Sequence, residues 1–171
     1  KKGWSTVFGE ARVQDAGGLW HGPTAFQQLI PALAGEALAV ATDFLQPDAC
    51  SAVADLYCGL GASARRWRER GAGVMGVELD GEAVECARRN APGAEILRGT
   101  CATRLPQLRA WTDGLPPESI PLAWVNPPRM GVEPEVLTWL ASEWRPTRLA
   151  LLSCSPGTLR RDLSALSDAG Y

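Results

Sequence analysis

The chain has 171 residues, of which 46% are hydrophobic and 21% charged, a size and composition typical of one globular domain. It contains no run of about 18 apolar residues that predicts a membrane span, and its start lacks the apolar stretch of a signal peptide. A net charge of −2 and a pI near 5.5 exclude the basic surplus that a free-standing nucleic-acid-binding domain shows.

The first 45 residues predict a small hairpin followed by a long helix, which we expect to be part of the same domain as a core at residues 46–171. Short alternating segments at residues 11–13 and 19–21, separated by glycines, predict the hairpin. Apolar residues recurring between positions 24 and 45 predict the helix, with a break or kink at Pro31 and Gly35.

Strands and helices alternate after residue 46. This alternation implies right-handed crossovers and a mostly parallel sheet with helices on both faces, which is the Rossmann-like α/β fold class. The predicted strands are residues 53–57, 73–78, 94–97, 122–125 and 148–152. The predicted helices are residues 65–70, 81–90, 105–111, 134–144 and 158–169.

A glycine-rich loop follows the first predicted core strand and indicates a nucleotide-containing cofactor. Gly59 and Gly61 allow a tight turn and close approach to a ligand, and Glu78 ends the next strand, where a carboxylate can bind ribose hydroxyls. Asp55 and Tyr57 are unusual in the strand of a dinucleotide-binding site, so S-adenosylmethionine is favoured over a nicotinamide cofactor. The alternative without a cofactor is an ordinary glycine turn with a solvated Glu78.

The segment Asn126-Pro127-Pro128-Arg129 ends the fourth predicted core strand, on the same edge as the glycine loop. Two prolines stiffen the backbone, and the Asn126 carboxamide offers both a donor and an acceptor. Asn126 can therefore pair with the edge of a uracil or bind a reacting exocyclic amine. The alternative is a strand-to-helix turn without a role in binding.

Cys154 follows the fifth predicted core strand and is therefore expected at that edge too. Ser155 predicts a helix N-cap and Pro156 the first helical residue, and the positive end of a helix favours the nucleophilic thiolate. Cys154 is a candidate nucleophile, and the alternative is a cysteine packed in the core.

The cysteines as a set indicate a reducing compartment. There are five of them, an odd number without Cys-x-x-Cys spacing, which argues against a disulfide framework and against a zinc site. We therefore expect a cytoplasmic protein without a structural or catalytic metal.

Several motifs in register resemble the catalytic domain of the RNA uridine-C5 methyltransferases, which make 5-methyluridine in tRNA or rRNA. They are Phe26-Gln27-Gln28, residues 55–61, Gly76-Val77-Glu78, Asn126-Pro127-Pro128-Arg129, Ser153-Cys154-Ser155-Pro156 and Arg161-Asp162-Leu163. The resemblance implies a tRNA or rRNA substrate, S-adenosylmethionine as cofactor and Cys154 as the nucleophile that adds to C6 of uracil. It further implies a cofactor site that includes Gln28, Tyr57, Gly59, Gly61, Glu78 and Asn126.

The sequence departs from the family pattern in several places. The family has Asp at the position of Asn126, and it often has Asn at the positions of Ile30 and Ala62. No segment like the family's His-Val-Glu, which carries the general base, follows Cys154; only Asp162 and Asp168 are carboxylates there. We also expect no RNA-binding β-barrel and no last two strands of the methyltransferase sheet.

Three alternatives stay open. One is an amine-directed methyltransferase that uses Asn126-Pro127-Pro128, and another is a module that binds the cofactor without full catalytic activity. The third is a nicotinamide-dependent oxidoreductase.

Overall fold

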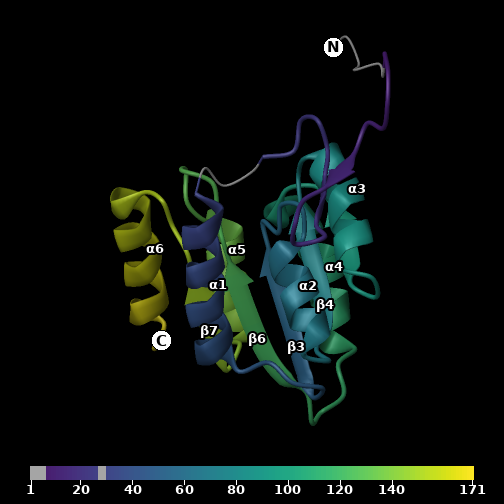
Figure 1. Ribbon diagram of the computed structural model, residues 1–171. Coiled ribbons are helices and arrows are strands. Elements are labelled where there is room, and N and C mark those ends of the chain that lie inside the picture. Colours follow the sequence, from purple (N-terminus) through teal and green to yellow (C-terminus); the bar gives the residue numbers. More distant parts are fainter. Residues whose placement is uncertain (1–6, 27–29) are drawn as a thin grey trace.

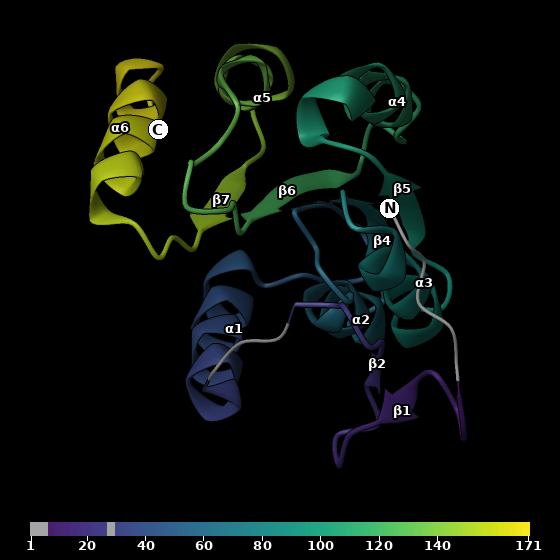
Figure 2. The ribbon, with the colours of Figure 1, turned by 90° about the horizontal axis from the view of Figure 1, so that it is seen from above.

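The computed structural model describes residues 7–26 and 30–171, and the main sheet in it lies between two layers of helices (Figure 1). The sheet is formed by β3 (Ser51–Leu56), β4 (Gly73–Glu78), β5 (Glu95–Arg98), β6 (Ile120–Val125) and β7 (Arg148–Leu151). Figure 2 shows α1 (Pro31–Leu45), α2 (Ala62–Glu69) and α3 (Gly81–Asn90) on one face. The other face carries α4 (Cys101–Asp113), α5 (Pro134–Thr138) and α6 (Pro156–Asp168).

All five strands of the main sheet are parallel, in the order β5-β4-β3-β6-β7. This arrangement confirms the predicted Rossmann-like α/β class. Strand side chains alternate between the two faces, so Val53 and Leu122 pack towards α1, α2 and α3. Their neighbours Ala54 and Ala123 pack towards α4, α5 and α6. Because both faces are covered, β3 is buried at every position.

The predicted hairpin is present and lies on α3. Strands β1 (Val13–Gln14) and β2 (Trp20–His21) pair antiparallel. The side chain of Asn90 accepts a hydrogen bond from the Trp20 N–H at 2.7 Å and donates one to the Trp20 carbonyl at 3.0 Å. Arg12 forms a bidentate ion pair with Glu82, at 2.6 and 3.0 Å. Both ends of α3 thus hold the hairpin.

The long helix differs from its prediction at its start. It begins at Pro31, which occupies the first turn, and continues through Gly35 without interruption. The predicted kink at these residues is wrong because proline is tolerated where the N–H would have no helical partner. Leu33, Val40 and Phe44 are exposed, whereas the opposite side of the helix, with Leu45, is buried.

The region after β5 is more helical than its prolines predict. Thr100 caps α4 by accepting a hydrogen bond from Thr103 N–H at 3.1 Å, and Pro106 lies inside the helix. The predicted helix 134–144 is divided into α5 and a π-helical turn, η1 (Trp139–Trp144), in which the rings of Trp139 and Trp144 stack at 4.9 Å.

Among the described residues, none of the helices combines the length and apolarity needed to cross a bilayer.

Candidate functional site

The carboxyl ends of β3, β4, β6 and β7 meet at one edge of the sheet, which we name the carboxyl edge. The chain passes from β3 to β4 and β5 on one side and returns to β6 and β7 on the other, so strand order reverses between β3 and β6. Such a reversal point is where ligands bind in open α/β sheets. Three of the segments that leave the sheet there carry predicted site residues: the glycine loop (residues 57–61), residues 126–129 and residues 153–155.

Backbone hydrogen bonds extend the sheet slightly into each of these segments. Their donors and acceptors are Cys58 N and Val77 O at 3.0 Å, Asn126 N and Leu56 O at 3.2 Å, and Leu152 N and Val125 O at 2.9 Å. The sheet therefore sets the starting point of the glycine loop, of the Asn-Pro-Pro-Arg segment and of the Cys154 segment relative to one another.

The glycine loop has a left-handed backbone at three positions. Tyr57 has φ +60°, Gly59 φ +56° and Gly61 φ +83°. A Cβ atom on Gly61 would lie 2.8 Å from the Cα of Ala87, whereas one on Gly59 would meet open space. Gly61 thus permits close packing against α3, and Gly59 supplies only backbone freedom. The Tyr57 conformation is costly for a residue with a side chain.

Glu78 holds the glycine loop through its carboxylate. One oxygen, Oε2, accepts a hydrogen bond from Gly59 N–H at 2.9 Å, and Oε1 accepts one from Asp80 N–H at 2.8 Å. A carboxylate has about four lone-pair positions, so two of them remain for hydroxyl donors. Glu78 is half-buried at the end of β4.

Asp55 lies beneath the loop and has no contact with solvent. It is fully buried in β3 and accepts a hydrogen bond from Trp67 Nε1 at 3.1 Å. Burial raises the pKa of Asp55 to about 7, and the negative charge of Glu78 contributes to the rise. Asp55 therefore holds α2 against β3 through its hydrogen bond with Trp67, a residue of that helix.

Cys154 lies just before α6, as the sequence predicts, and the structure shows it to be exposed. Cys50 is also exposed, but it precedes β3 and so lies at the opposite edge of the sheet. Cys58, Cys86 and Cys101 are buried, and burial raises the pKa of each thiol. Cys154 is thus the accessible thiol of the carboxyl edge.

Helix α6 begins as predicted, with Ser155 at the N-cap and Pro156 in the first turn. The Ser155 side chain does not cap the helix. The hydroxyl of Ser153 instead accepts a hydrogen bond from Ser155 N–H at 3.2 Å. Ser153 therefore fixes the turn that presents Cys154.

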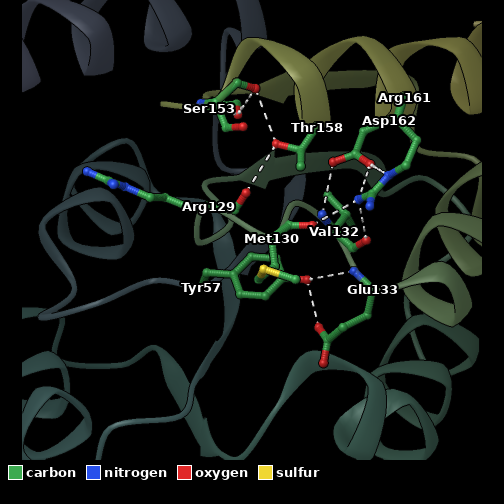
Figure 3. Close-up of polar contacts among 10 residues, drawn as sticks. Tyr57, Arg129, Met130, Val132, Glu133, Ser153, Thr158, Arg161 and Asp162 are labelled. Atoms are coloured by element: carbon green, nitrogen blue, oxygen red, sulfur yellow. Dashed lines mark hydrogen bonds and ion pairs between the residues drawn. The ribbon is translucent and has the colours of Figure 1, made fainter.

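The Asn-Pro-Pro-Arg segment forms a turn beside that loop. Asn126 is half-buried, Pro127 is buried, and Pro128 and Arg129 are exposed. Gly131 N–H donates to the Pro128 carbonyl at 2.8 Å, which closes the turn. Figure 3 shows the Arg129 side chain extending away from the neighbouring polar groups.

Two groups of polar contacts around this turn were not anticipated from the sequence (Figure 3). In one, the buried Asp162 of α6 accepts a hydrogen bond from Val132 N–H at 2.9 Å. In the other, the Tyr57 hydroxyl donates to Glu133 Oε2 at 2.7 Å. For the contact of Asp162, the sequence offered one signal, the motif Arg161-Asp162. For the contact of Tyr57 with Glu133 it offered none, because the two residues are 76 positions apart.

One predicted site residue, Gln28, lies outside the described residues. A cavity of about 400 Å³ lies away from the predicted site, between the hairpin and helices α2 and α3, where Trp20, Arg65 and Arg89 contribute to its lining. None of the described site residues lines it.

Comparisons with known proteins give relatives in sequence and in structure. No protein-family model matches the chain. An uncharacterized RNA methyltransferase of Gloeobacter violaceus is 36% identical over 124 residues, which is 70% of this chain and 25% of the relative. A 23S rRNA (uracil(747)-C(5))-methyltransferase of Shewanella loihica is 31% identical over 155 residues, 90% of this chain and 39% of the relative.

Among solved structures, the Pyrococcus abyssi tRNA (uracil-54, C5)-methyltransferase in complex with S-adenosyl-L-homocysteine has a similar fold. The TM-score is 0.72 at 23% identity, over 93% of this chain and 38% of that one. The chain spans between 25% and 39% of the length of the curated relatives it matches. Over most of its own length, this chain therefore resembles the RNA methyltransferases, a uracil-C5 enzyme among them, and has the Rossmann-like fold of S-adenosylmethionine-dependent methyltransferases.

Proposed function

We propose that this chain is the catalytic domain of an S-adenosylmethionine-dependent RNA methyltransferase, and that it acts on C5 of a uridine in tRNA or rRNA through Cys154. The observation that carries the proposal is the position of Cys154. An exposed thiol lies at the carboxyl edge, one strand away from Asn126 and two from the glycine loop. The names of the sequence relatives support the reaction class.

The residues of the glycine loop fit the nucleoside end of S-adenosylmethionine. The free lone pairs of Glu78 suit ribose hydroxyls, and the open space beside Gly59 allows a ligand to approach the backbone. When bound, the cofactor supplies an electrophilic methyl group. Tyr57, Gly59, Gly61, Glu78 and Asn126, together with Gln28, are the residues we assign to this site.

Cys154 supplies the nucleophile that the chemistry needs. C5 of uracil is a weak nucleophile, so the thiolate first forms a bond from Sγ to C6, and the C5–C6 π electrons become available at C5. After methylation, a base removes the C5 proton, the C5–C6 double bond forms again, and the Sγ–C6 bond breaks to return the thiolate. We assign Asn126 to the uracil edge as well, since its carboxamide can both donate and accept and the segment that carries it leaves the carboxyl edge beside that of Cys154.

The carboxylates that follow Cys154 do not suit the role of the base. Asp162 is fully buried and bound to Val132 N–H and Arg161. Asp168 ends α6, thirteen residues long, and therefore lies roughly 18 Å along the helix from its start. The base that completes the reaction is accordingly a group other than these two.

Covalent trapping by RNA containing 5-fluorouridine tests the proposal, with the natural full-length protein and S-adenosylmethionine. Fluorine at C5 cannot leave as a cation, so the adduct with Cys154 persists and is visible by mass spectrometry. We expect trapping by the wild type and by Cys50→Ser, an exposed cysteine at the opposite edge. Cys154→Ser should not trap, and a variant that traps as well as the wild type refutes the proposal.

Ligand-induced shifts in melting temperature separate the alternatives. A rise with S-adenosylhomocysteine and none with NADH supports the methyltransferase, and the reverse supports an oxidoreductase. Methyl transfer that survives Cys154→Ala favours an amine substrate held by Asn126. Binding of S-adenosylhomocysteine without transfer to any tested RNA favours a non-catalytic cofactor-binding module.

A further inference from the structure

We propose that Arg161 and Asp162 are positioning residues, which hold the Asn-Pro-Pro-Arg segment at a fixed distance from the loop that carries Cys154. This proposal rests on the proposed function, because it concerns the geometry of the same reaction. Neither residue touches the predicted cofactor or substrate positions; both act through the backbone of residues 130–132. We name these two side chains and their backbone partners the α6 clamp.

Asp162 provides the inner half of the clamp. Its carboxylate is fully buried, and its Oδ2 accepts a hydrogen bond from Val132 N–H at 2.9 Å. The Oδ1 atom accepts two hydrogen bonds from Arg161, at 2.8 Å from Nε and 2.6 Å from an Nη atom. A buried carboxylate is tolerated when its charge is paired and its lone pairs are used.

Arg161 provides the outer half. The same Nη atom that contacts Asp162 also donates to the carbonyls of Met130 and Val132, at 3.2 Å each. The rigid guanidinium thus joins one carboxylate and two backbone oxygens, which the single ammonium of lysine does not reproduce. The arrangement is visible in Figure 3, where both side chains point from α6 to the loop.

Gly131 shows how closely the loop approaches the helix. It has φ +79°, and a Cβ atom there would lie 2.3 Å from the Arg161 Nη and 2.7 Å from Asp162 Oδ2. Any side chain at this position would therefore separate the loop from the clamp. The close approach is a property that glycine alone allows in this loop.

The clamp connects two loops that the sheet no longer holds. The last bond between their strands joins Leu152 N–H to the Val125 carbonyl at 2.9 Å. Beyond it, the Asn126 and Cys154 segments leave the sheet separately. They are joined again by Thr158 Oγ1, which lies 3.4 Å from the Arg129 carbonyl, and by the clamp. Each segment is thereby fixed at both of its ends, by the sheet on one side and by the contacts of α6 on the other. Asn126 and Cys154 lie between these two sets of contacts.

The physical consequence is preorganisation. A displacement of about 1 Å in a catalytic group can reduce a rate by about a hundredfold. The hydrogen bonds of the clamp go to residues 130–132 on the α6 side of the sheet. Glu78 ends β4, two strands from β6 in the strand order, and the glycine loop reaches this region through Tyr57, whose hydroxyl bonds to Glu133. Loosening the clamp leaves Glu78 and the Tyr57–Glu133 bond in place, so it should reduce the rate of the chemical step much more than it weakens cofactor binding.

The test compares Arg161→Ala and Asp162→Asn with Arg160→Ala, an exposed neighbour on α6, in the natural full-length protein. We expect kcat for methyl transfer, and the rate of trapping by 5-fluorouridine RNA, to fall at least about tenfold in both clamp variants. The dissociation constant for S-adenosylhomocysteine should stay within about twofold of the wild type, because Glu78 and Gly59 are untouched. Arg160→Ala should match the wild type in every measurement.

Amide hydrogen exchange measures the clamp independently of activity. In Arg161→Ala, which loses the hydrogen bonds to the Met130 and Val132 carbonyls and leaves the buried Asp162 without its charge partner, exchange should accelerate at residues 130–132 and at 153–156 but not at Gly59 and Gly61. Unchanged exchange, or faster exchange with an unchanged kcat, overturns the positioning role. Wild-type protein that fails to trap fluorouridine refutes the proposed function instead, while hydrogen exchange still decides whether the clamp joins the two loops.

Discussion

The hydroxyl of Tyr57 donates a 2.7 Å hydrogen bond to the carboxylate of Glu133 and so joins the glycine loop to the start of α5. The other oxygen of Glu133 faces the Ala102 N–H, at 3.4 Å, at the start of α4. One carboxylate thus connects three segments near the carboxyl edge. Burial and the neighbouring negative groups raise the pKa of Tyr57 above its ordinary value, so the phenol stays a donor at physiological pH.

Removing this phenol should weaken cofactor binding. Tyr57→Phe loses a hydrogen bond to a charged acceptor, and we expect the free energy of unfolding to fall by about 1.5–3 kcal/mol. Because Tyr57 precedes Gly59 in a left-handed conformation, its release should also loosen the loop and raise the dissociation constant for S-adenosylhomocysteine, measured by calorimetry. Tyr171→Phe, which loses bonds to the carbonyls of Leu140 and Pro146, should lose stability but keep cofactor affinity. Equal affinities in both variants would contradict the linkage.

Replacing Glu78 should affect binding more than stability. In Glu78→Gln one carboxylate oxygen becomes an NH₂ group, which accepts no hydrogen bond, so the bond from Gly59 N–H or the bond from Asp80 N–H is lost. The side chain also loses the negative charge that favours ribose hydroxyls. We expect S-adenosylhomocysteine to bind at least about tenfold more weakly, a change of about 1.4 kcal/mol. Glu85→Gln, an exposed change on the neighbouring helix, is the control, and a loss of affinity there as large as for Glu78 would argue against the assigned site.

Alanine at two glycines should change stability in opposite directions. Gly61→Ala places a Cβ 2.8 Å from the Cα of Ala87 at φ +83°, so we expect the free energy of unfolding to fall by about 2–4 kcal/mol. Gly35→Ala lies inside α1, where a Cβ meets open space, and should raise it by about 0.5–1 kcal/mol. Urea denaturation of both variants measures the two changes, and a harmless Gly61→Ala would show that α2 and α3 can separate freely.

Asp55 should make stability fall as pH rises. Its folded-state pKa is raised to about 7, whereas the unfolded value is about 3.9. Between these values the folded state holds a proton that the unfolded state has released, so the free energy of unfolding falls between about pH 4 and pH 7. The total for this group is about 4 kcal/mol.

Urea unfolding at about pH 5 and about pH 7 checks the assignment of this dependence to Asp55. Asp55→Asn should remove most of the difference between the two conditions, since its amide does not titrate. Asp43→Asn, at an exposed position in α1, should retain it. A slope that persists in Asp55→Asn would assign the effect to another group.

Local chemistry along the chain was sufficient to predict most of the elements. The strand at Gly73–Glu78 and the helix at Gly81–Asn90 begin and end where the sequence predicts, because apolar runs and capping residues such as Asp80 act over a few positions. The helix Cys101–Asp113 is longer than the predicted 105–111, because Thr100 caps it several residues earlier. Pro31 was misread as a kink because the pattern alone does not show on which side of a proline a helix lies.

The candidate site shows a similar division. Parallel strands bring their carboxyl ends to one edge, so Gly59, Glu78, Asn126 and Cys154 could be expected there from the order of elements alone. Their roles in binding and catalysis stay predictions. The contacts of Glu133 with Tyr57 and of Asp162 with Val132 join residues 76 and 30 positions apart, and such pairings leave no periodic signal.

The sequence by itself determined the α/β alternation, the glycine loop and the place of Cys154 between the last strand and α6, since each depends on near neighbours in the chain. The exposure of this thiol was decided by the tertiary structure alone. Only the tertiary structure decided that the apolar stripe of Leu33, Val40 and Phe44 is exposed while Leu45 is buried. It also decided that Asp162 is fully buried, with its carboxylate bound to the Val132 N–H. The physical reason is that burial and long-range hydrogen bonds depend on which surfaces meet in space, and a helical or strand period fixes only which residues share a face.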